Sequence, residues 1–92
     1  NSLINANTLL DFIPKSLINS VSEAIFVGER RWDIILKNGL YLKLSENNIT
    51  ESFVNFNEIY KNISNDELKN IESIDLRMQN KAILKFTNQK ND

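Results

Sequence analysis

One stretch of alternating side chains constrains the fold of this chain more than any other. From Trp32 to Leu36 every second residue is apolar, and the same holds from Leu40 to Leu44. A period of two places one set of side chains on a buried face of a strand and the other in water. Between the two runs, Asn38-Gly39 tolerates the positive φ angles of a type I′ turn. We therefore expect a β-hairpin with strands near 31–37 and 40–44.

The chain before the hairpin predicts helical turns and one more strand. Apolar residues at spacings of three and four predict a short helix that ends near Ile13. Proline suits the first position of a helix, so a second turn is expected over 14–19. The apolar run 24–27 predicts a strand over 22–28 that is covered on both faces, with a bend after it.

The chain after the hairpin predicts a helix and a second strand pair. Over 49–63 apolar residues repeat every three or four positions, which indicates an amphipathic helix that closes one face of a sheet. Two short strands follow, over 71–77 and 81–86. The expected fold class is α+β: an antiparallel β-sheet of about five strands, in the order α-β-β-β-α-β-β, with helices packed on one face.

Length and composition limit the organisation and the chemistry. The 92 residues suffice for one small domain over 1–92, with frayed ends expected over 1–7 and 87–92. The chain has no Cys and no His, which removes thiol chemistry, the commonest general base and the commonest zinc ligand. Its carboxylates have no spacing typical of a metal loop or of acid–base catalysis. We expect no enzymatic activity, no catalytic residue, no metal and no cofactor.

Arg30, Arg31 and Trp32 allow two interpretations. Arginine beside an aromatic ring is a common stacking pair for nucleic acids, so a small anion- or nucleic-acid-binding module is one hypothesis. Against it, Glu29 and Asp33 flank the pair, and the net charge of −1 offers no bulk field for a polyanion. The alternative places Trp32 in the core with one arginine reaching outward to a carboxylate, in this chain or in a partner. We place the structural role ahead and expect no nucleic acid.

The last strand is a second candidate for binding. If it lies at a sheet edge, its backbone N–H and C=O groups can accept a strand from another chain. Met78, Ile83 and Phe86 would then be apolar neighbours of that edge. Lys81 and Lys85 are equally typical of an edge protected against association, and periodicity does not decide between the two.

Three motifs resemble a known family. The chain reads GERRWDI over 28–34, then LKNG and LKLSE within 36–46, and IDLR over 74–77. In this order the motifs resemble the periplasmic β domain of the bacterial FtsQ/DivIB cell-division family, over 24–86. Ser45 stands where the family commonly has proline.

The resemblance implies a non-catalytic divisome scaffold. Such proteins sit in the inner membrane at the division septum, with one transmembrane helix and a POTRA domain, both absent from this chain, ahead of a periplasmic β domain. The β domain links early and late division proteins by binding FtsB, in its complex with FtsL, through strand addition to its last strand, while an arginine of the RRW motif meets a partner carboxylate. The family's partner-binding positions, transferred to this sequence, together with the apolar edge residue Ile83, give the expected contact set. It consists of Arg30, Arg31, Arg77, Met78, Asn80, Ala82, Ile83, Lys85 and Phe86. Lys85 replaces a small residue of the family, and only one of Arg30 and Arg31 is expected to contact the partner.

Overall fold

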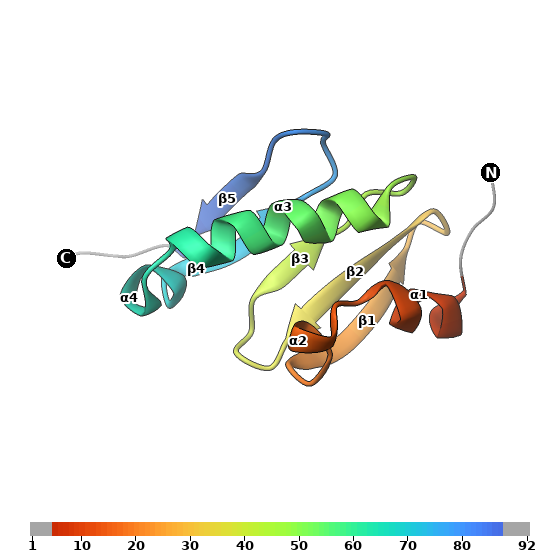
Figure 1. The fold of residues 1–92 in the computed structure, drawn as a ribbon, viewed down its shortest axis with the longest axis horizontal. Coiled ribbons are helices and arrows are strands. Elements are labelled where there is room, and N and C mark those ends of the chain that lie inside the picture. Colours follow the sequence, from red (N-terminus) through yellow and green to blue (C-terminus); the bar gives the residue numbers. More distant parts are fainter. Residues whose placement is uncertain (1–4, 88–92) are drawn as a thin grey trace.

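The computed structural model describes residues 5–87, which form one five-stranded sheet with helices against it (Figure 1). The elements, in chain order, are α1 (Ala6–Phe12), α2 (Lys15–Ile18), β1 (Val21–Val27), β2 (Arg31–Leu36), β3 (Tyr41–Lys43), α3 (Ile49–Asn62), α4 (Asn65–Leu68), β4 (Ile71–Asp75) and β5 (Ile83–Phe86). The expected α+β class is confirmed.

The strands lie in the order β1-β2-β3-β4-β5, so spatial order follows chain order. Three of the four pairings are antiparallel, and β3 pairs with β4 in parallel, with Leu42 opposite Ile74. The expected, fully antiparallel sheet is therefore wrong in this detail. The physical reason is α3, which carries the chain back along the sheet and makes β4 start at the same end as β3.

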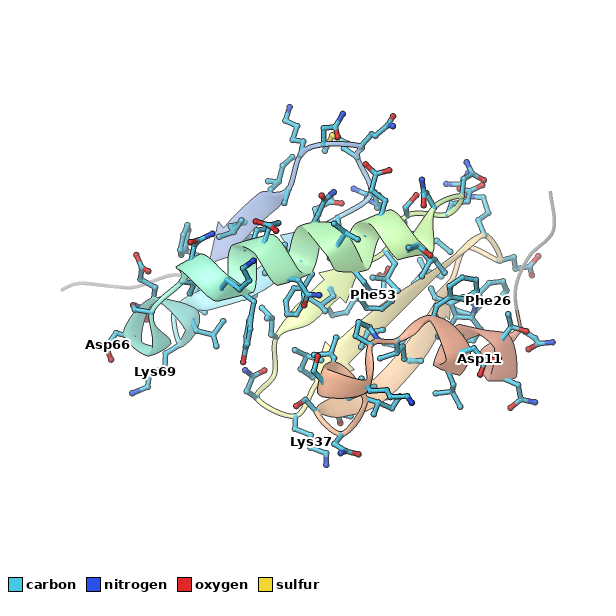
Figure 2. The ribbon with its side chains drawn as sticks, viewed as in Figure 1. Asp11, Phe26, Lys37, Phe53, Asp66 and Lys69 are labelled. Atoms are coloured by element: carbon cyan, nitrogen blue, oxygen red, sulfur yellow. The ribbon has the colours of Figure 1, made fainter. Side chains whose placement is uncertain are left out.

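The helices lie on one face of the sheet, with α3 over β3 and β4 and with α1 and α2 over β1 and β2 (Figure 1). Phe53 and Phe56 of α3 point into the core, and Asn48 caps this helix by accepting a hydrogen bond from the Glu51 N–H at 3.2 Å. The core that this layer encloses consists of Leu9, Ile13, Leu17, Ile34, Leu36, Leu40, Leu42, Leu44, Ile49, Phe53, Phe56, Ile71, Ile74 and Leu76. Figure 2 shows Phe53 beneath its helix.

The connection between β2 and β3 differs from the expected two-residue turn. The Gly39 N–H donates to the Leu36 carbonyl at 2.8 Å, and the Leu36 N–H donates to the Leu40 carbonyl at 2.9 Å. Gly39 has a φ of 93°, whereas Asn38 is not among the described residues with positive φ. This is the pattern of a three-residue loop with a glycine bulge, in which only the last loop residue needs positive φ. The type I′ prediction is wrong, although the hairpin itself is confirmed.

Positive φ at two successive residues occurs in the turn between β1 and β2. Gly28 has a φ of 59° and Glu29 of 57°, and the Arg30 N–H donates to the Val27 carbonyl at 3.1 Å. The bend expected after the first strand is thus a tight turn whose second position has a side chain in the left-handed region. It presents Arg30 at the tip of the hairpin.

β1 is less covered than expected. It forms one edge of the sheet, its burial alternates only weakly, Ala24 is exposed, and 39% of the surface of Phe26 is accessible. The prediction of a strand covered on both faces is wrong because the helices reach only one face of the outermost strand.

The two ends expected to be frayed lie partly outside the described residues. Within them, Asn5 caps α1, because its Oδ1 accepts a hydrogen bond from the Thr8 N–H at 2.8 Å. At the other end, the Thr87 N–H donates to the Asn70 carbonyl at 2.8 Å and extends the pairing of β5 by one residue.

Candidate functional site

β5 forms the edge of the sheet opposite β1. Its pairing with β4 sets Ile83 opposite Asp75 and Lys85 opposite Ser73. The Leu76 N–H points to β3, since it donates to the Lys43 carbonyl at 2.8 Å, so its neighbour Asp75 turns its backbone groups toward β5. The backbone groups of their partners, Ile83 and Lys85, therefore point to β4. Because this direction alternates along a strand, the N–H and C=O groups of Leu84 and Phe86 point away from β4. Within residues 5–87, this side of β5 is a free sheet edge.

The side chains of β5 alternate between the two faces of the sheet. Ile83 and Lys85 lie on the face opposite the helices, and Leu84 and Phe86 lie on the helix side. Ile83 and Phe86 are large apolar residues with 46% and 56% of their surface accessible, whereas Leu84 packs against the core. Ala82 packs there too. The edge therefore combines free backbone groups with exposed apolar side chains.

Among residues 5–87, Lys85 forms one ion pair. Its Nζ lies 3.8 Å from Glu72 Oε2, and both side chains are more than half exposed. Such exposed pairs contribute little, about 0–1 kcal/mol. The ammonium of Lys85 thus remains accessible along the edge.

The loop between β4 and β5 holds Arg77, Met78 and Asn80. The guanidinium of Arg77 donates from Nε and Nη2 to the two oxygens of Asp75, at 2.8 Å and 2.7 Å. This bidentate pairing holds the pKa of Asp75 below its ordinary value, since it favours the ionised carboxylate. Asn80 has a φ of 61°, which asparagine tolerates better than most residues, and allows the chain to turn back toward β5.

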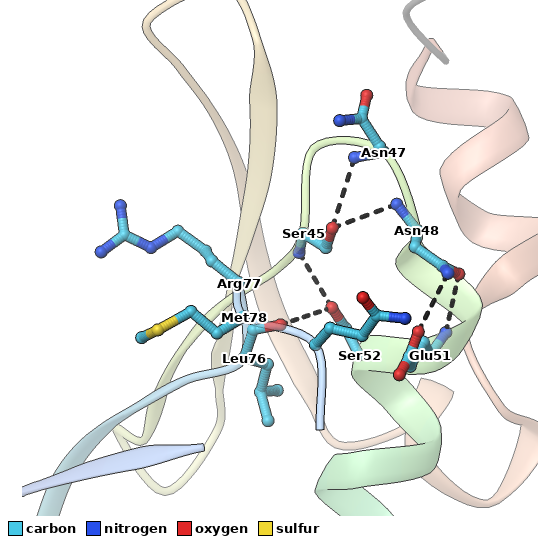
Figure 3. A pocket seen from close by; sticks show the side chains of 9 residues that line it. Ser45, Asn47, Asn48, Glu51, Ser52, Leu76, Arg77 and Met78 are labelled. Carbon is cyan, nitrogen blue, oxygen red and sulfur yellow. Dashed lines mark hydrogen bonds between the residues drawn. The ribbon is translucent and has the colours of Figure 1, made fainter. Parts of the chain in front are cut away.

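A buried serine ties this loop to the rest of the fold (Figure 3). The Ser52 hydroxyl, at the start of α3, donates to the Leu76 carbonyl at 2.9 Å and accepts from the Ser45 N–H at 2.8 Å. Ser45 Oγ in turn accepts from the N–H groups of Asn47 and Asn48. Proline, the residue expected here from the family resemblance, has no N–H to give to Ser52. This chain instead uses hydrogen bonds to fix the backbone from which Arg77 and Met78 project.

Arg31 forms a bidentate ion pair with the buried carboxylate of Asp33. Its Nε and Nη2 donate to Asp33 Oδ1 and Oδ2 at 2.9 Å and 3.2 Å, and the Tyr41 hydroxyl donates to Oδ2 at 2.7 Å. Asp33 is completely buried although it lies on the face opposite the helices. The hydrogen bond to Asp33 raises the pKa of Tyr41 above 10.0, because ionisation would remove the proton that Tyr41 donates to the carboxylate. The same carboxylate raises the pKa of Arg31.

The sequence did not lead us to predict that Asp33 is the buried acceptor for both Arg31 and Tyr41. The signal was available, since a spacing of two places Arg31 and Asp33 on one face of a strand. The third member, Tyr41, comes from the neighbouring strand, where it pairs with Ile35.

Arg30 differs from Arg31 in being exposed. Its side chain is 68% accessible, and its Nε lies 3.7 Å from Glu46, which is a weak contact. An open depression of about 400 Å³ brings Arg30 together with Arg31, Arg77 and Met78. Four of the nine candidate residues thus line one surface, while Ile83, Lys85 and Phe86 lie on β5 and Asn80 and Ala82 lead into it.

Trp32 does not share that surface. It faces the helix side, packs against the core, and its ring lies 4.9 Å from that of Phe26. Arg31 and Trp32 therefore project from opposite faces, so they do not form the stacking pair that the nucleic-acid hypothesis uses.

The described part of the chain shows neither a metal-binding cluster nor a membrane-spanning helix. Among residues 5–87, no group of three or more Asp, Glu, His or Cys converges as a metal ion would need. In the same range, no helix has the length and apolar character to cross a membrane.

The amino-acid sequence of this chain is similar to that of a known protein family. The family model described as "Cell division protein FtsQ/DivIB, C-terminal" matches residues 2–77, a range that ends before β5. Similar curated proteins, each described as cell division protein FtsQ, come from Rickettsia bellii (37% identical, 85% of this chain and 30% of the relative), Bradyrhizobium diazoefficiens (32%, 76% and 20%) and Bartonella bacilliformis (32%, 79% and 23%). The chain spans less than a third of the length of these relatives. The family model covers most of the chain, and the chain belongs to the FtsQ/DivIB family of cell-division proteins, whose C-terminal domain it matches.

Proposed function

We propose that this domain is a non-catalytic scaffold of the divisome that binds FtsB, in its complex with FtsL, by β-strand addition to β5. In this proposal the domain works on the periplasmic side of the inner membrane at the division septum, and it links early and late division proteins. One observation carries it: within residues 5–87, β5 is a free sheet edge whose Ile83 and Phe86 are exposed.

Strand addition suits the geometry of β5. The backbone groups of residues 84 and 86 point outward and would supply the hydrogen bonds that set the register of a partner strand. The exposed ring of Phe86 offers an apolar anchor of the kind that dominates binding energy at interfaces. Met78, 37% exposed, adds a separate apolar side chain beside Arg77 at the start of the loop.

The depression lined by Arg30, Arg31 and Arg77 supports a second contact with the partner, between charged groups. Because Arg31 already pairs with Asp33 and Arg77 with Asp75, Arg30 is the arginine that we assign to a partner carboxylate. Exposed charges of this kind mainly raise the rate of association and fix orientation. Arg31 and Arg77 would shape the depression and contribute through their remaining N–H groups.

A titration of the ¹⁵N-labelled domain with the periplasmic segment of FtsB from the same organism tests the proposal. We expect chemical-shift changes at the amides of 77–87 and of 30–31, and little change along α1 and α2. Phe86→Ala should weaken binding about tenfold or more, as loss of a buried aromatic anchor does. Arg30→Ala should weaken it less and leave stability unchanged.

Val54→Ala is the matched control for Phe86→Ala, since Val54 is also an exposed apolar residue but lies on the outer face of α3. It should leave the affinity unchanged. Shift changes that spare β5 would refute strand addition.

A further inference from the structure

The edge strand β5 and the loop before it carry a local excess of basic residues. The segment 76–86 contains Arg77, Lys81 and Lys85 and no acidic residue. Three of the 11 basic residues lie there, which leaves eight against all 12 acidic residues in the remainder of the chain. The carboxylates that pair with Arg77 and Lys85 are Asp75 and Glu72, which belong to β4, one strand further in.

These cations differ in how far they are already neutralised. Arg77 is held by both oxygens of Asp75, so an incoming group would have to compete with that pairing. Within the described part of the chain, the ion pair of Lys85 is the 3.8 Å contact to Glu72, and 69% of its side chain is accessible. Of the three, Lys85 lies within the strand itself, where its position fixes which residue of an added strand it faces.

The pleat of β5 sets the pattern that an added strand would meet. Lys85 lies on the face opposite the helices, in the cross-strand row of Ser73 and Tyr41. A residue placed beside it on the free side would have its Cβ about 5 Å away, a distance at which opposite charges attract and like charges repel. The residues on either side of that one would project to the helix side, beside Leu84 and Phe86, which are apolar.

We infer that the strand received by β5 carries a carboxylate opposite Lys85, flanked by apolar residues that pack beside Leu84 and Phe86. This inference rests on the proposed strand addition and specifies its chemistry. The partner segment would alternate apolar, acidic, apolar, and its binding would weaken as ionic strength rises. Lys85 would act in recognition rather than in protection of the edge.

A charge swap tests the inference with the FtsB segment of the same organism as the probe. Lys85→Gln should weaken binding about two- to fivefold, as loss of one exposed cross-strand pair does. Lys85→Glu should weaken it about tenfold, because two carboxylates would then face each other. Replacement of one acidic residue of the FtsB segment by lysine should restore binding to the Lys85→Glu variant and weaken binding to the unchanged domain.

Lys37→Glu is the matched control, since it makes the same change in net charge in the β2–β3 connection, away from β5 (Figure 2). It should alter the affinity less than twofold. If Lys85→Glu binds as tightly as the unchanged domain or more tightly, while the amides of 82–86 still shift, the inference is overturned and strand addition stands. If those amides do not shift with the unchanged domain, strand addition fails and the inference fails with it.

Discussion

At the scale of single residues, Asp33 is the most consequential polar group of the fold. It is fully buried and accepts hydrogen bonds from Arg31 and Tyr41. Asp33→Asn removes the charge that Arg31 pairs with, so we expect the free energy of unfolding to fall by about 2–4 kcal/mol, measured by urea denaturation. Tyr41→Phe should cost less, about 1–2 kcal/mol, since it removes one hydrogen bond. Asp66→Asn, at an exposed position of α4, is the control and should have no measurable effect. Unchanged stability of Asp33→Asn would mean that the buried carboxylate is dispensable.

Residue identities predicted some of this site and left the rest open. Alternation along the strand predicted that Trp32 joins the core while an arginine reaches a carboxylate, and both features are present. The alternation did not predict which of the two arginines pairs with Asp33. The environment of that carboxylate also depends on Tyr41 of the neighbouring strand, whose hydroxyl donates to it. Whether Arg30 contacts a partner stays a prediction.

At the scale of elements, the edge position of β5 has a consequence for hydrogen exchange. In the free domain we expect the amides of Ile83 and Lys85, which face β4, to exchange slowly, and those of Leu84 and Phe86 to exchange fast. Binding of the FtsB segment should slow exchange at Leu84 and Phe86, and NMR-detected exchange measures all four amides. Slow exchange at Leu84 and Phe86 in the free domain would contradict an open edge.

The positions of helices and strands along the chain were more predictable than the pairing of the strands in the sheet. The amphipathic stripe over 49–63 predicted α3 almost to the residue, because burial of one helix face imposes its period directly. The parallel pairing of β3 with β4 was missed, since strand direction depends on where a helix returns the chain, which periodicity does not record. The glycine bulge at Gly39 was missed because Asn-Gly serves more than one hairpin geometry. The edge was likewise undecidable, since the strand order of the whole sheet defines it.

At the scale of the whole molecule, the pH dependence of stability follows from the composition and from two hydrogen-bonded carboxylates, Asp75 with Arg77 and Asp33 with Tyr41. The chain has no His, so few groups titrate near neutral pH. The pKa of Asp75 is lowered in the fold mainly by the hydrogen bond from Arg77, so its contribution is present above its ordinary pKa of 3.8 and is lost as pH falls through the lower, folded value. The pKa of Tyr41 is raised above 10.0, so its contribution is present below that value and is lost as pH rises through the folded value. We expect the urea midpoint to be flat from about pH 5 to 9 and to fall on both sides.

Variants separate the two limbs of that profile. Arg77→Gln should reduce the loss of stability on the acid side, and Tyr41→Phe should reduce the loss on the alkaline side, each without changing the other limb. A midpoint that varies strongly between pH 6 and 8 would contradict this account.

The short β3 strand also determines how this domain would carry load. Between β1-β2 and β4-β5, the sheet is continuous through only three parallel residue pairs: Tyr41 with Ser73, Leu42 with Ile74, and Lys43 with Asp75. A partner strand seated on β5 would pull on the rest of the domain through this junction, the packing of α3 and the Ser52 tie to Leu76. Tension along the strands would shear the three pairs together, while tension across them would open the pairs in turn. The domain is therefore mechanically anisotropic, and its resistance to force depends on the direction from which its partner pulls.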